Sequence, residues 1–567
     1  MDKNRRPQKL KWAQVSCQLR SYRSEEIYPT PPRQRPALAN TILAAGAQRL
    51  AQQPIFSSPC LCCPAGEGRK ISPLYSAERF PYQRYSPRPG QPALRADCGG
   101  RTASYPADVG WLAALVVVLV LSLPVPQLFA EQNPAQSPVL LQVPLKALPL
   151  ETILPLPKGS LAEKPTLDSA WELIPIKRLP IEQSQSLQTF RRASQEDHAP
   201  TFVQCVAGLH ADGQPDQNRP QLAVQIVSAA DSASSQTSKS SKTSFSPRDT
   251  SSGLRVYQLQ KPQRAPSVAF EWKQSSAVSL GLWEGQTPVL VYNYGPITNP
   301  SVPATDHRRT RACYVHPVYG LGGEVLTEDF PKDHYHHHGL FWAWPHIVIE
   351  GKEHDLWAGA TIRQEFVRWL ARQTGPVCAV LGVENGWYVG AKKVMVERIW
   401  FWVYRTVPGH HRSIDIALFL EPTDQPVTLW GAPEKSYGGL TVRFAPSSRS
   451  ETEITVPSGR TTEDLLNTPL KWADFTSKMV GSQFRSGAAI MIHPRHPDYP
   501  PTWLTRHYGA MCVGWPGVRP KTLQPHQPLR LQYRLWIHPG PVCLESLTAA
   551  YEAFCAGVEE VQWAESY

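Results

Sequence analysis

Apolar residues alternate with polar ones, or run unbroken, in many short segments between residues 277 and 540. Examples are 277–283 (AVSLGLW), 393–407 (KVMVERIWFWVYRTV) and 529–540 (LRLQYRLWIHPG). These segments are rich in Val, Ile, Trp and Tyr and are bounded by Gly, Pro, Asn or Asp, which is typical of β-strands. The sequence therefore predicts an all-β fold built as a large antiparallel β-sandwich, not alternating βα units.

Only the C-terminus has a helical period. Leu544, Leu547, Tyr551, Phe554 and Val558 recur at steps of three and four residues, which predicts one amphipathic helix. We expect the sandwich and this C-terminal helix to form one domain over residues 261–560.

Residues 131–260 have a different texture. The first part is punctuated by proline, and residues 228–253 are a Ser/Thr-rich run of low complexity, so the sequence predicts a flexible linker. Within it, 201–213 and 221–229 are apolar enough for two strands of a small β element.

An apolar segment in the N-terminal region indicates that the protein is exported. Residues 109–123 are almost purely apolar, and Ala130 offers a small residue for cleavage, so 109–130 is expected to be a signal peptide or a signal anchor. Residues 1–108 are expected to be a disordered basic extension, or to follow from a start codon assigned too far upstream. We therefore expect a periplasmic, envelope or extracellular protein that meets a membrane only through 109–130. The six cysteines beyond this segment are then free to form disulfides.

The formal charge of +11 does not indicate a nucleic-acid partner. Residues 1–110 hold 17 Lys/Arg and 7 Asp/Glu, so the remainder carries 41 against 40 and is nearly neutral. A neutral main body gives no electrostatic argument for binding DNA or RNA.

The candidate chemistry lies at residues 333–338, which read Asp-His-Tyr-His-His-His. Imidazole serves as acid, base or metal ligand near neutral pH, and burying several imidazoles without a role is costly. If this segment continues as a strand, His336, His338, Trp342 and Trp344 share one face and His337 takes the other. Indole faces beside titratable groups suit a sugar ring, so we predict a carbohydrate or another small polar ligand.

Further candidates lie elsewhere in the chain. The predicted catalytic residues are His334, His336, His337, Asp333 and Glu434. The predicted substrate-binding residues are Trp342, Trp344, Trp357, His316, His338, Lys435, Arg506 and His507.

Several motifs occur together in a recognisable order: YVHPVYGLGGEVLTEDFPKDHYHHHGLFWAW, EKSYGG and a late HP…W..R.YG loop. Over roughly residues 270–545 the chain resembles a family of uncharacterised, often exported bacterial proteins, DUF6807, labelled "methane oxygenase PmoA-like". His338 departs from the family, which usually has arginine there. We do not expect methane oxidation, because that complex needs several spanning helices and this chain has one apolar segment.

The family is in turn similar to the galactose-mutarotase-type supersandwich, whose relatives bind or process carbohydrates. That resemblance implies a histidine acid, His336 or His337, and a carboxylate base, Glu434 or Asp333, without a cofactor. Two alternatives stay open at this point. One is a divalent metal site formed by His334, His336 and His337 with His316 or Asp333. The other is a non-catalytic carbohydrate-binding module of the cell envelope.

Overall fold

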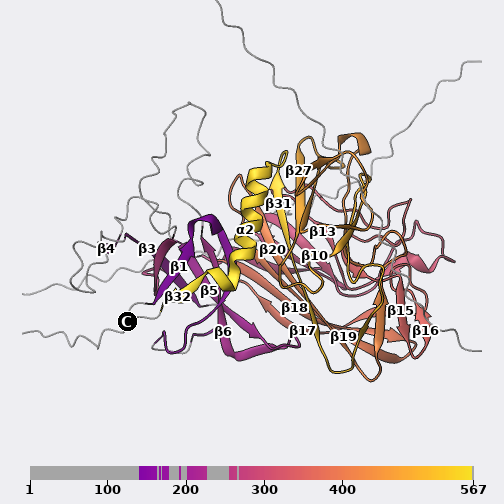
Figure 1. Cartoon of the computed structure of the whole chain (residues 1–567), viewed down its shortest axis with the longest axis horizontal. Coiled ribbons are helices and arrows are strands. Elements are labelled where there is room, and N and C mark those ends of the chain that lie inside the picture. Colours follow the sequence, from indigo (N-terminus) through magenta and orange to yellow (C-terminus); the bar gives the residue numbers. More distant parts are fainter. Residues whose placement is uncertain are drawn as a thin grey trace, which may run out of the picture. The chain divides into compact units, whose positions relative to one another are not determined.

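A computed structural model describes residues 139–161, 165–167, 169–177, 191–192, 201–226, 254–264 and 267–564 (Figure 1). In this part of the chain most residues are in antiparallel strands, and one long helix, α2 (Leu544–Glu560), lies near the C-terminus. The predicted all-β sandwich with a C-terminal helix is confirmed. The predictions for 1–108, 109–130 and 228–253 concern residues outside the described ranges.

The sandwich consists of two nine-stranded sheets. The site sheet has the order β25-β28-β29-β22-β14-β13-β10-β9-β8, and the back sheet has the order β17-β18-β19-β20-β31-β27-β26-β23-β24. The site sheet comprises β8 (Phe270–Ser276), β9 (Ser279–Glu284), β10 (Thr287–Asn293), β13 (Tyr314–Val318), β14 (Leu340–Ala343), β22 (Gly439–Arg443), β25 (Thr468–Pro469), β28 (Thr502–Thr505) and β29 (Ala510–Gly514). The back sheet comprises β17 (Arg363–Gln373), β18 (Cys378–Val389), β19 (Lys392–Tyr404), β20 (Arg412–Pro422), β23 (Glu453–Val456), β24 (Gly459–Thr461), β26 (Trp472–Lys478), β27 (Arg485–Ile492) and β31 (Leu529–Pro539).

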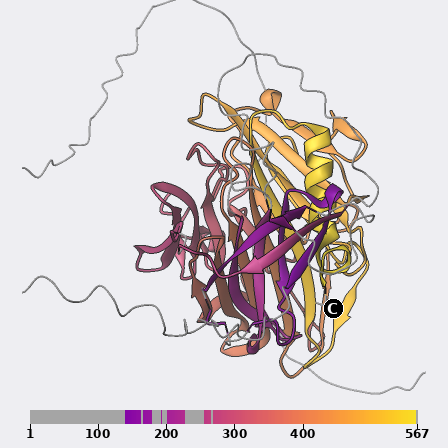
Figure 2. The ribbon, with the colours of Figure 1, turned by 90° about the vertical axis from the view of Figure 1, so that its left-hand side faces the viewer.

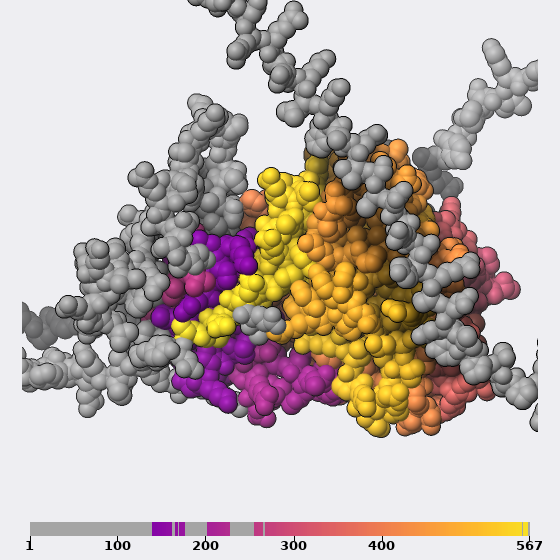
Figure 3. Space-filling view, viewed as in Figure 1, coloured from indigo at the N-terminus to yellow at the C-terminus, as the bar shows by residue number. Residues whose placement is uncertain are grey.

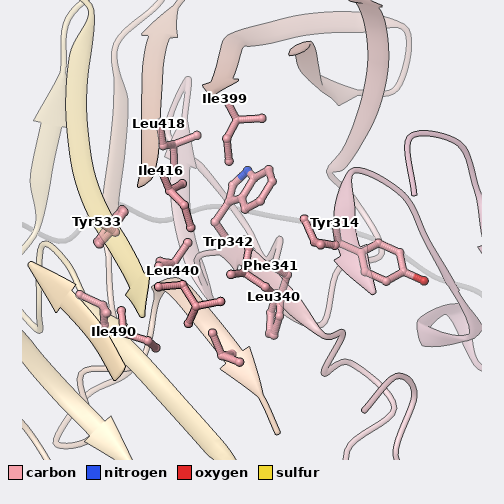
Figure 4. Close-up of a cluster of buried hydrophobic side chains, with 14 of the residues drawn as sticks. Tyr314, Leu340, Phe341, Trp342, Ile399, Ile416, Leu418, Leu440, Ile490 and Tyr533 are labelled. Carbon is pink, nitrogen blue, oxygen red and sulfur yellow. The ribbon is translucent and has the colours of Figure 1, made fainter. Parts of the chain in front are cut away.

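The main hydrophobic core lies between these two sheets (Figure 4). Trp342 and Leu440 of the site sheet face Ile399, Ile416 and Leu418 of the back sheet, and all five side chains are buried. Each such aliphatic side chain contributes about 2 kcal/mol when it is removed from water. This core fixes β14, and β14 in turn fixes the end of the histidine segment that precedes it.

Two smaller sheets complete this half of the molecule. One has the order β16-β15-β21-β30, and the other pairs β11 with β12. Their strands are β11 (Ile297–Thr298), β12 (Thr310–Arg311), β15 (His346–Ile349), β16 (Lys352–His354), β21 (Val427–Trp430) and β30 (Lys521–Leu523). Short 3-10 turns lie at His307–Arg309 (η3) and Arg449–Glu451 (η4).

A third large sheet occupies the region that we expected to be a linker. Its order is β2-β6-β5-β3-β7-β1-β32, with β4 paired to β3. The strands are β1 (Leu140–Pro144), β2 (Leu150–Pro155), β3 (Ala170–Lys177), β4 (Arg191–Arg192), β5 (Thr201–Leu209), β6 (Pro215–Ile226), β7 (Leu254–Gln260) and β32 (Gln562–Ala564), and a 3-10 turn lies at Leu145–Ala147 (η1). The two strands expected at 201–213 and 221–229 are confirmed as β5 and β6. The prolines at 144 and 155 end strands instead of preventing them, which is where a missing N–H is tolerated.

The outer face of the back sheet is covered from two directions. The third sheet lies against it (Figure 2). Val206 and Ala223 of the third sheet belong to one buried cluster with Trp400 and Trp402 of the back sheet. Helix α2, yellow in Figure 3, packs on Trp472 and Trp536 through its predicted apolar face, which includes Leu547, Tyr551 and Phe554. The cover by the third sheet explains why β18 and β19 are buried on both faces along most of their length.

The predictions of a membrane segment at 109–130 and of disulfides concern the chain's location. No helix among the described residues is long and apolar enough to cross a membrane. The six cysteines beyond residue 200 form no disulfide within the described ranges, and four of them are buried on separate segments: Cys205, Cys313, Cys378 and Cys512.

Candidate functional site

The histidine segment consists of two consecutive turns, not a strand. The backbone N–H of His334 donates to Pro331 O, and the N–H of His337 donates to His334 O, each at 2.9 Å. Strand β14 begins only at Leu340 and ends at Ala343, and His346 belongs to a different sheet. The predicted alternation from His336 to His346 is therefore wrong, because a strand period cannot pass through two turns.

The turns bring three imidazole rings together. The rings of His334 and His337 are stacked, with centroids 4.6 Å apart and planes 5° apart. The ring of His336 stands edge-on to both, at 4.8 Å from His337 and 5.6 Å from His334. His336 and His337 thus lie side by side, although the strand pattern had placed them on opposite faces. We call His334, His336 and His337 the imidazole cluster.

Aromatic side chains from distant segments surround this cluster. Tyr508 stacks on the far face of His334 at 5.3 Å, from the loop between β28 and β29. Trp357 lies 5.8 Å from His337 and 6.3 Å from His336, and Tyr437 lies 4.8 Å from Trp357. Trp357 was predicted to be near the site, and the structure places it there.

Two nitrogen atoms of the cluster are buried without a partner. None of the three Nδ1 atoms of the cluster has a well-aligned hydrogen-bond partner among the described residues, but Nδ1 of His334 lies 2.8 Å from the Asp333 carboxylate, which leaves His336 and His337 as the two without a polar neighbour at this atom. Leaving such a group unsatisfied costs about 1–3 kcal/mol, which a bound ligand can recover. This is the feature of the cluster that points most directly to a ligand.

The local environment keeps two of the imidazoles neutral. Burial, with the nearby His334 and Arg308, lowers the pKa of His336 to about 4. Burial and its neighbouring histidines also lower the pKa of His337 well below the usual value for histidine. At neutral pH both rings therefore accept or share a proton, and neither starts as a charged acid.

A buried arginine holds the carboxylate of the site. Arg443 of β22 donates to Glu328 and to Asp333, each at 3.1 Å, and its guanidinium lies 4.7 Å from the ring centre of Tyr508. Partial burial acts to raise the pKa of Asp333, but His334 and Arg443 outweigh it, so this pKa is lowered. Asp333 also lies 2.8 Å from Nδ1 of His334, so one carboxylate links the arginine to the imidazole cluster.

His338 belongs to a separate, fully internal network. Its Nδ1 lies 2.8 Å from Asp329, and the hydroxyl of Tyr314 donates to the same carboxylate at 2.7 Å. The ring packs edge-on against Phe330 at 4.5 Å. Nδ1 of His338 thus has its partner inside the protein, so this histidine supports the turns from beneath and does not offer that nitrogen to a ligand, as we had predicted.

The remaining predicted residues are spread over several places. Nδ1 of His316 lies 3.0 Å from the hydroxyl of Thr327, under the segment that contains His338, where burial lowers the pKa of His316. Glu434 and Lys435 are exposed in the turn between β21 and β22. Lys435 stands two residues before Tyr437. Arg506 and His507 precede Tyr508 in the same loop, and Nδ1 of His507 lies 2.7 Å from Asp464.

Trp342 and Trp344 do not offer a platform for a ligand. Both indoles are completely buried in the core, and Nε1 of Trp344 donates to Trp515 O at 2.7 Å. The prediction that they bind substrate is wrong, because the strand face that carries them points between the two sheets. Trp357, Tyr437 and Tyr508 occupy the position that we had expected these tryptophans to fill.

Sequence reasoning missed Arg443, Tyr508 and the pair Glu328 and Asp329. The two carboxylates stand directly before the histidine segment, in the motif TEDFPKDH, and that proximity was a usable signal. Arg443 reads as an ordinary polar position in the strand GLTVRFA, so no local pattern marks it. Among the described residues, no group of three or more His, Cys, Asp or Glu side chains is arranged to hold a metal ion.

Comparisons with known proteins agree with part of the resemblance. Residues 281–552 match the model of a family of unknown function, DUF6807. No curated protein matches the chain. The resemblance to galactose mutarotase and the methane oxygenase label are not tested by these findings.

Two solved structures are similar over part of their length. One is a GH36 alpha-galactosidase from Geobacillus stearothermophilus in complex with 1-deoxygalactonojirimycin, with 9% identity, a TM-score of 0.26, and coverage of 50% of this chain and 42% of the other. The other is an alpha-mannosidase from Enterococcus faecalis, with 11% identity, a TM-score of 0.29, and coverage of 76% and 46%. The chain thus spans less than half of either structure.

Proposed function

We propose that the protein binds a carbohydrate, or another small polyhydroxylated ligand, at the imidazole cluster and acts on it by acid–base chemistry. The observation that carries this proposal is the pair of buried Nδ1 atoms, in His336 and His337, that have no partner. A sugar hydroxyl both donates and accepts hydrogen bonds, so it can satisfy a neutral imidazole in either tautomer. The proposal therefore requires no charged ligand.

The aromatic surroundings support the same class of ligand. Trp357 and Tyr437 contact each other, and Trp357 borders the imidazole rings. Tyr508 adds a further ring that lies flat on His334. Ring faces pack against the C–H face of a sugar while the imidazoles take its hydroxyls, which is how mixed polar and aromatic sites orient such ligands.

The electrostatics favour an imidazole base. A histidine with a pKa of about 4 is deprotonated at neutral pH, so His336 starts as a proton acceptor, but a weak one that needs a negative charge beside it to hold the proton it takes. Asp333 is held ionised by Arg443 and supports the positive charge that then develops on the cluster. The resemblance implied a histidine acid and a carboxylate base, and we instead assign the base to the histidine. Epimerisation and elimination both begin with the removal of a proton, so these two reactions fit this assignment best.

The test is the binding of neutral sugars to the full chain and to single variants. In His336→Gln and His337→Gln the affinity should fall by about tenfold or more, the equivalent of one lost hydrogen bond to a buried group. His526→Gln is the matched control, because His526 is exposed in a turn far from the cluster in sequence. Unchanged affinity in both site variants would overturn the proposal.

The same proteins separate the two alternative functions. A protein that keeps its affinity for sugars but converts none of them is a binding module. Stoichiometric metal in the purified chain, lost in the His336→Gln/His337→Gln double variant, would instead indicate a histidine-ligated metal enzyme.

A further inference from the structure

A hollow borders the β28–β29 loop, which also carries Tyr508 of the imidazole site. It has a volume of about 610 Å³ and is lined by the segment around η4, by the β23–β24 hairpin and by one residue of the β28–β29 loop. Its lining residues are Ser448, Arg449, Ser450, Thr452, Arg460, Thr461, Thr462 and His507. We call it the hydroxyl hollow.

One short loop separates the hydroxyl hollow from the imidazole cluster. His507 lines the hollow, while the next residue, Tyr508, stacks on His334 at 5.3 Å. Consecutive Cα atoms are only about 3.8 Å apart. The hollow and the imidazole cluster therefore border the same loop, on which a ligand of more than one sugar unit would have to lie to contact both.

The charges of the hollow are compensated within the protein. Arg449 pairs with Asp464 at 3.1 Å, and Arg460 pairs with Glu453 at 2.6 Å. His507 is held on both sides, by Asp464 at Nδ1 (2.7 Å) and by the carbonyl of Thr461 at Nε2 (3.2 Å). Each cationic side chain of the lining already has a carboxylate, which disfavours a phosphate, a sulfate or an acidic sugar.

The neutral part of the lining is rich in hydroxyl groups. Five of the eight lining residues are Ser or Thr. Their hydroxyls are donors as well as acceptors and rotate to suit a partner. Thr462 and Ser450 are exposed there, and the hydroxyl of Ser450 lies 3.0 Å from that of Ser448, so the two serines present a pair of hydroxyls to a ligand. A lining of this kind matches a polyol better than an apolar molecule or an anion.

We infer that the hydroxyl hollow is a second binding subsite, which takes the further units of a neutral oligosaccharide whose first unit lies at the imidazole cluster. This inference rests on the proposed function and extends it from a single sugar to a chain. It assigns the β28–β29 loop, through His507 and Tyr508, as the wall shared by the two subsites.

The experiment measures affinity against ligand length. The probes are neutral malto-, cello- and manno-oligosaccharides of one to five units, titrated into the full chain. For the series that binds, affinity should rise by about tenfold from one unit to three. The double variant Ser450→Ala/Thr462→Val should lose most of this rise while it keeps the affinity for the single unit. Thr428→Val is the control, because Thr428 pairs with Thr522 on another sheet.

Each outcome bears on a different part of the account. Affinity that does not change with length, or an equal rise in the double variant, overturns the second subsite alone. Binding of acidic sugars in preference to neutral ones overturns it as well, because the hollow would then be an anion site. Failure of all neutral sugars to bind overturns this inference together with the proposed function.

Discussion

The four histidines of one short segment have two different roles, and their surroundings decide which. His338 has a carboxylate partner inside the protein, Asp329, which is itself held by Tyr314. His336 and His337 have buried nitrogens with no such partner. The composition of this segment predicts chemistry there, but four histidines within five residues cannot show which of them have partners.

The first prediction concerns protonation of His336. By NMR, its ring should titrate with a pKa of about 4, below the usual value of 6.5, because burial and His334 disfavour the charge. Between these two values the unfolded chain binds the proton and the folded chain does not, so this group makes the protein less stable as the pH falls below 6.5. Titration of His336 near 6.5 would show that its ring is solvated and not part of a buried cluster.

The second prediction concerns Arg443. Arg443→Gln should lower the free energy of unfolding by about 1–3 kcal/mol, because the buried guanidinium pairs with Glu328 and Asp333. It should also raise the pKa of Asp333, so the loss of ligand affinity at acidic pH should begin at a higher pH. Arg363→Gln removes an exposed pair with Glu365 and should change neither quantity. An unchanged onset of this loss in Arg443→Gln would remove Asp333 from the site.

At the scale of elements, the sequence predicted strands well where they are long and buried. The segments 393–407 and 529–540 form β19 and β31 as expected, because long runs of these strands are buried. It failed at 333–338, where hydrogen bonds of two turns override a strand-like pattern. It also failed at 140–155, where prolines at strand ends looked like the punctuation of a linker. The deciding contacts at 333–338 are local turn hydrogen bonds, whereas at 140–155 they are strand pairings with β6, β7 and β32, far away in the sequence.

The third prediction tests the element that ends the histidine turns. Gly339 has a φ of +35°, and a Cβ atom there would lie 2.2 Å from Val315 O. Gly339→Ala should therefore lower the free energy of unfolding by more than about 2 kcal/mol, from strain and from a backbone clash. Gly390 also has a positive φ, +58°, but its Cβ would meet nothing within 4 Å. Gly390→Ala should cost clearly less, and equal costs in a denaturant titration would contradict the close approach of β13 to the turns.

At the scale of the whole described molecule, the folded unit is larger than the segment that matches the family model. The matched residues, 281–552, exclude the third sheet, yet that sheet covers the outer face of β18–β20. The side chain of Gln204 accepts hydrogen bonds from the N–H groups of Val377 and Cys378 across this contact. The strand β32, at the C-terminal end, pairs with β1, so the third sheet is built from both ends of the described chain.

The fourth prediction tests this attachment. Gln204→Leu leaves two buried N–H groups without their acceptor, so the free energy of unfolding should fall by about 1–3 kcal/mol. Gln260→Leu, which removes a bond to Glu172 inside the third sheet, is the control and should have a smaller effect. Equal stabilities of Gln204→Leu and the unaltered chain would mean that the third sheet is not held by this contact.

The central claim is that partnerless imidazole nitrogens of His336 and His337 receive the hydroxyls of a neutral sugar. The most direct measurement is the ¹⁵N NMR signal of these two rings during titration with a neutral sugar that binds. The account predicts neutral rings in the free protein and a saturable shift of both Nδ1 signals, with the signal of the internally paired His338 nearly unchanged. Saturable binding that leaves the His336 and His337 signals in place would contradict it.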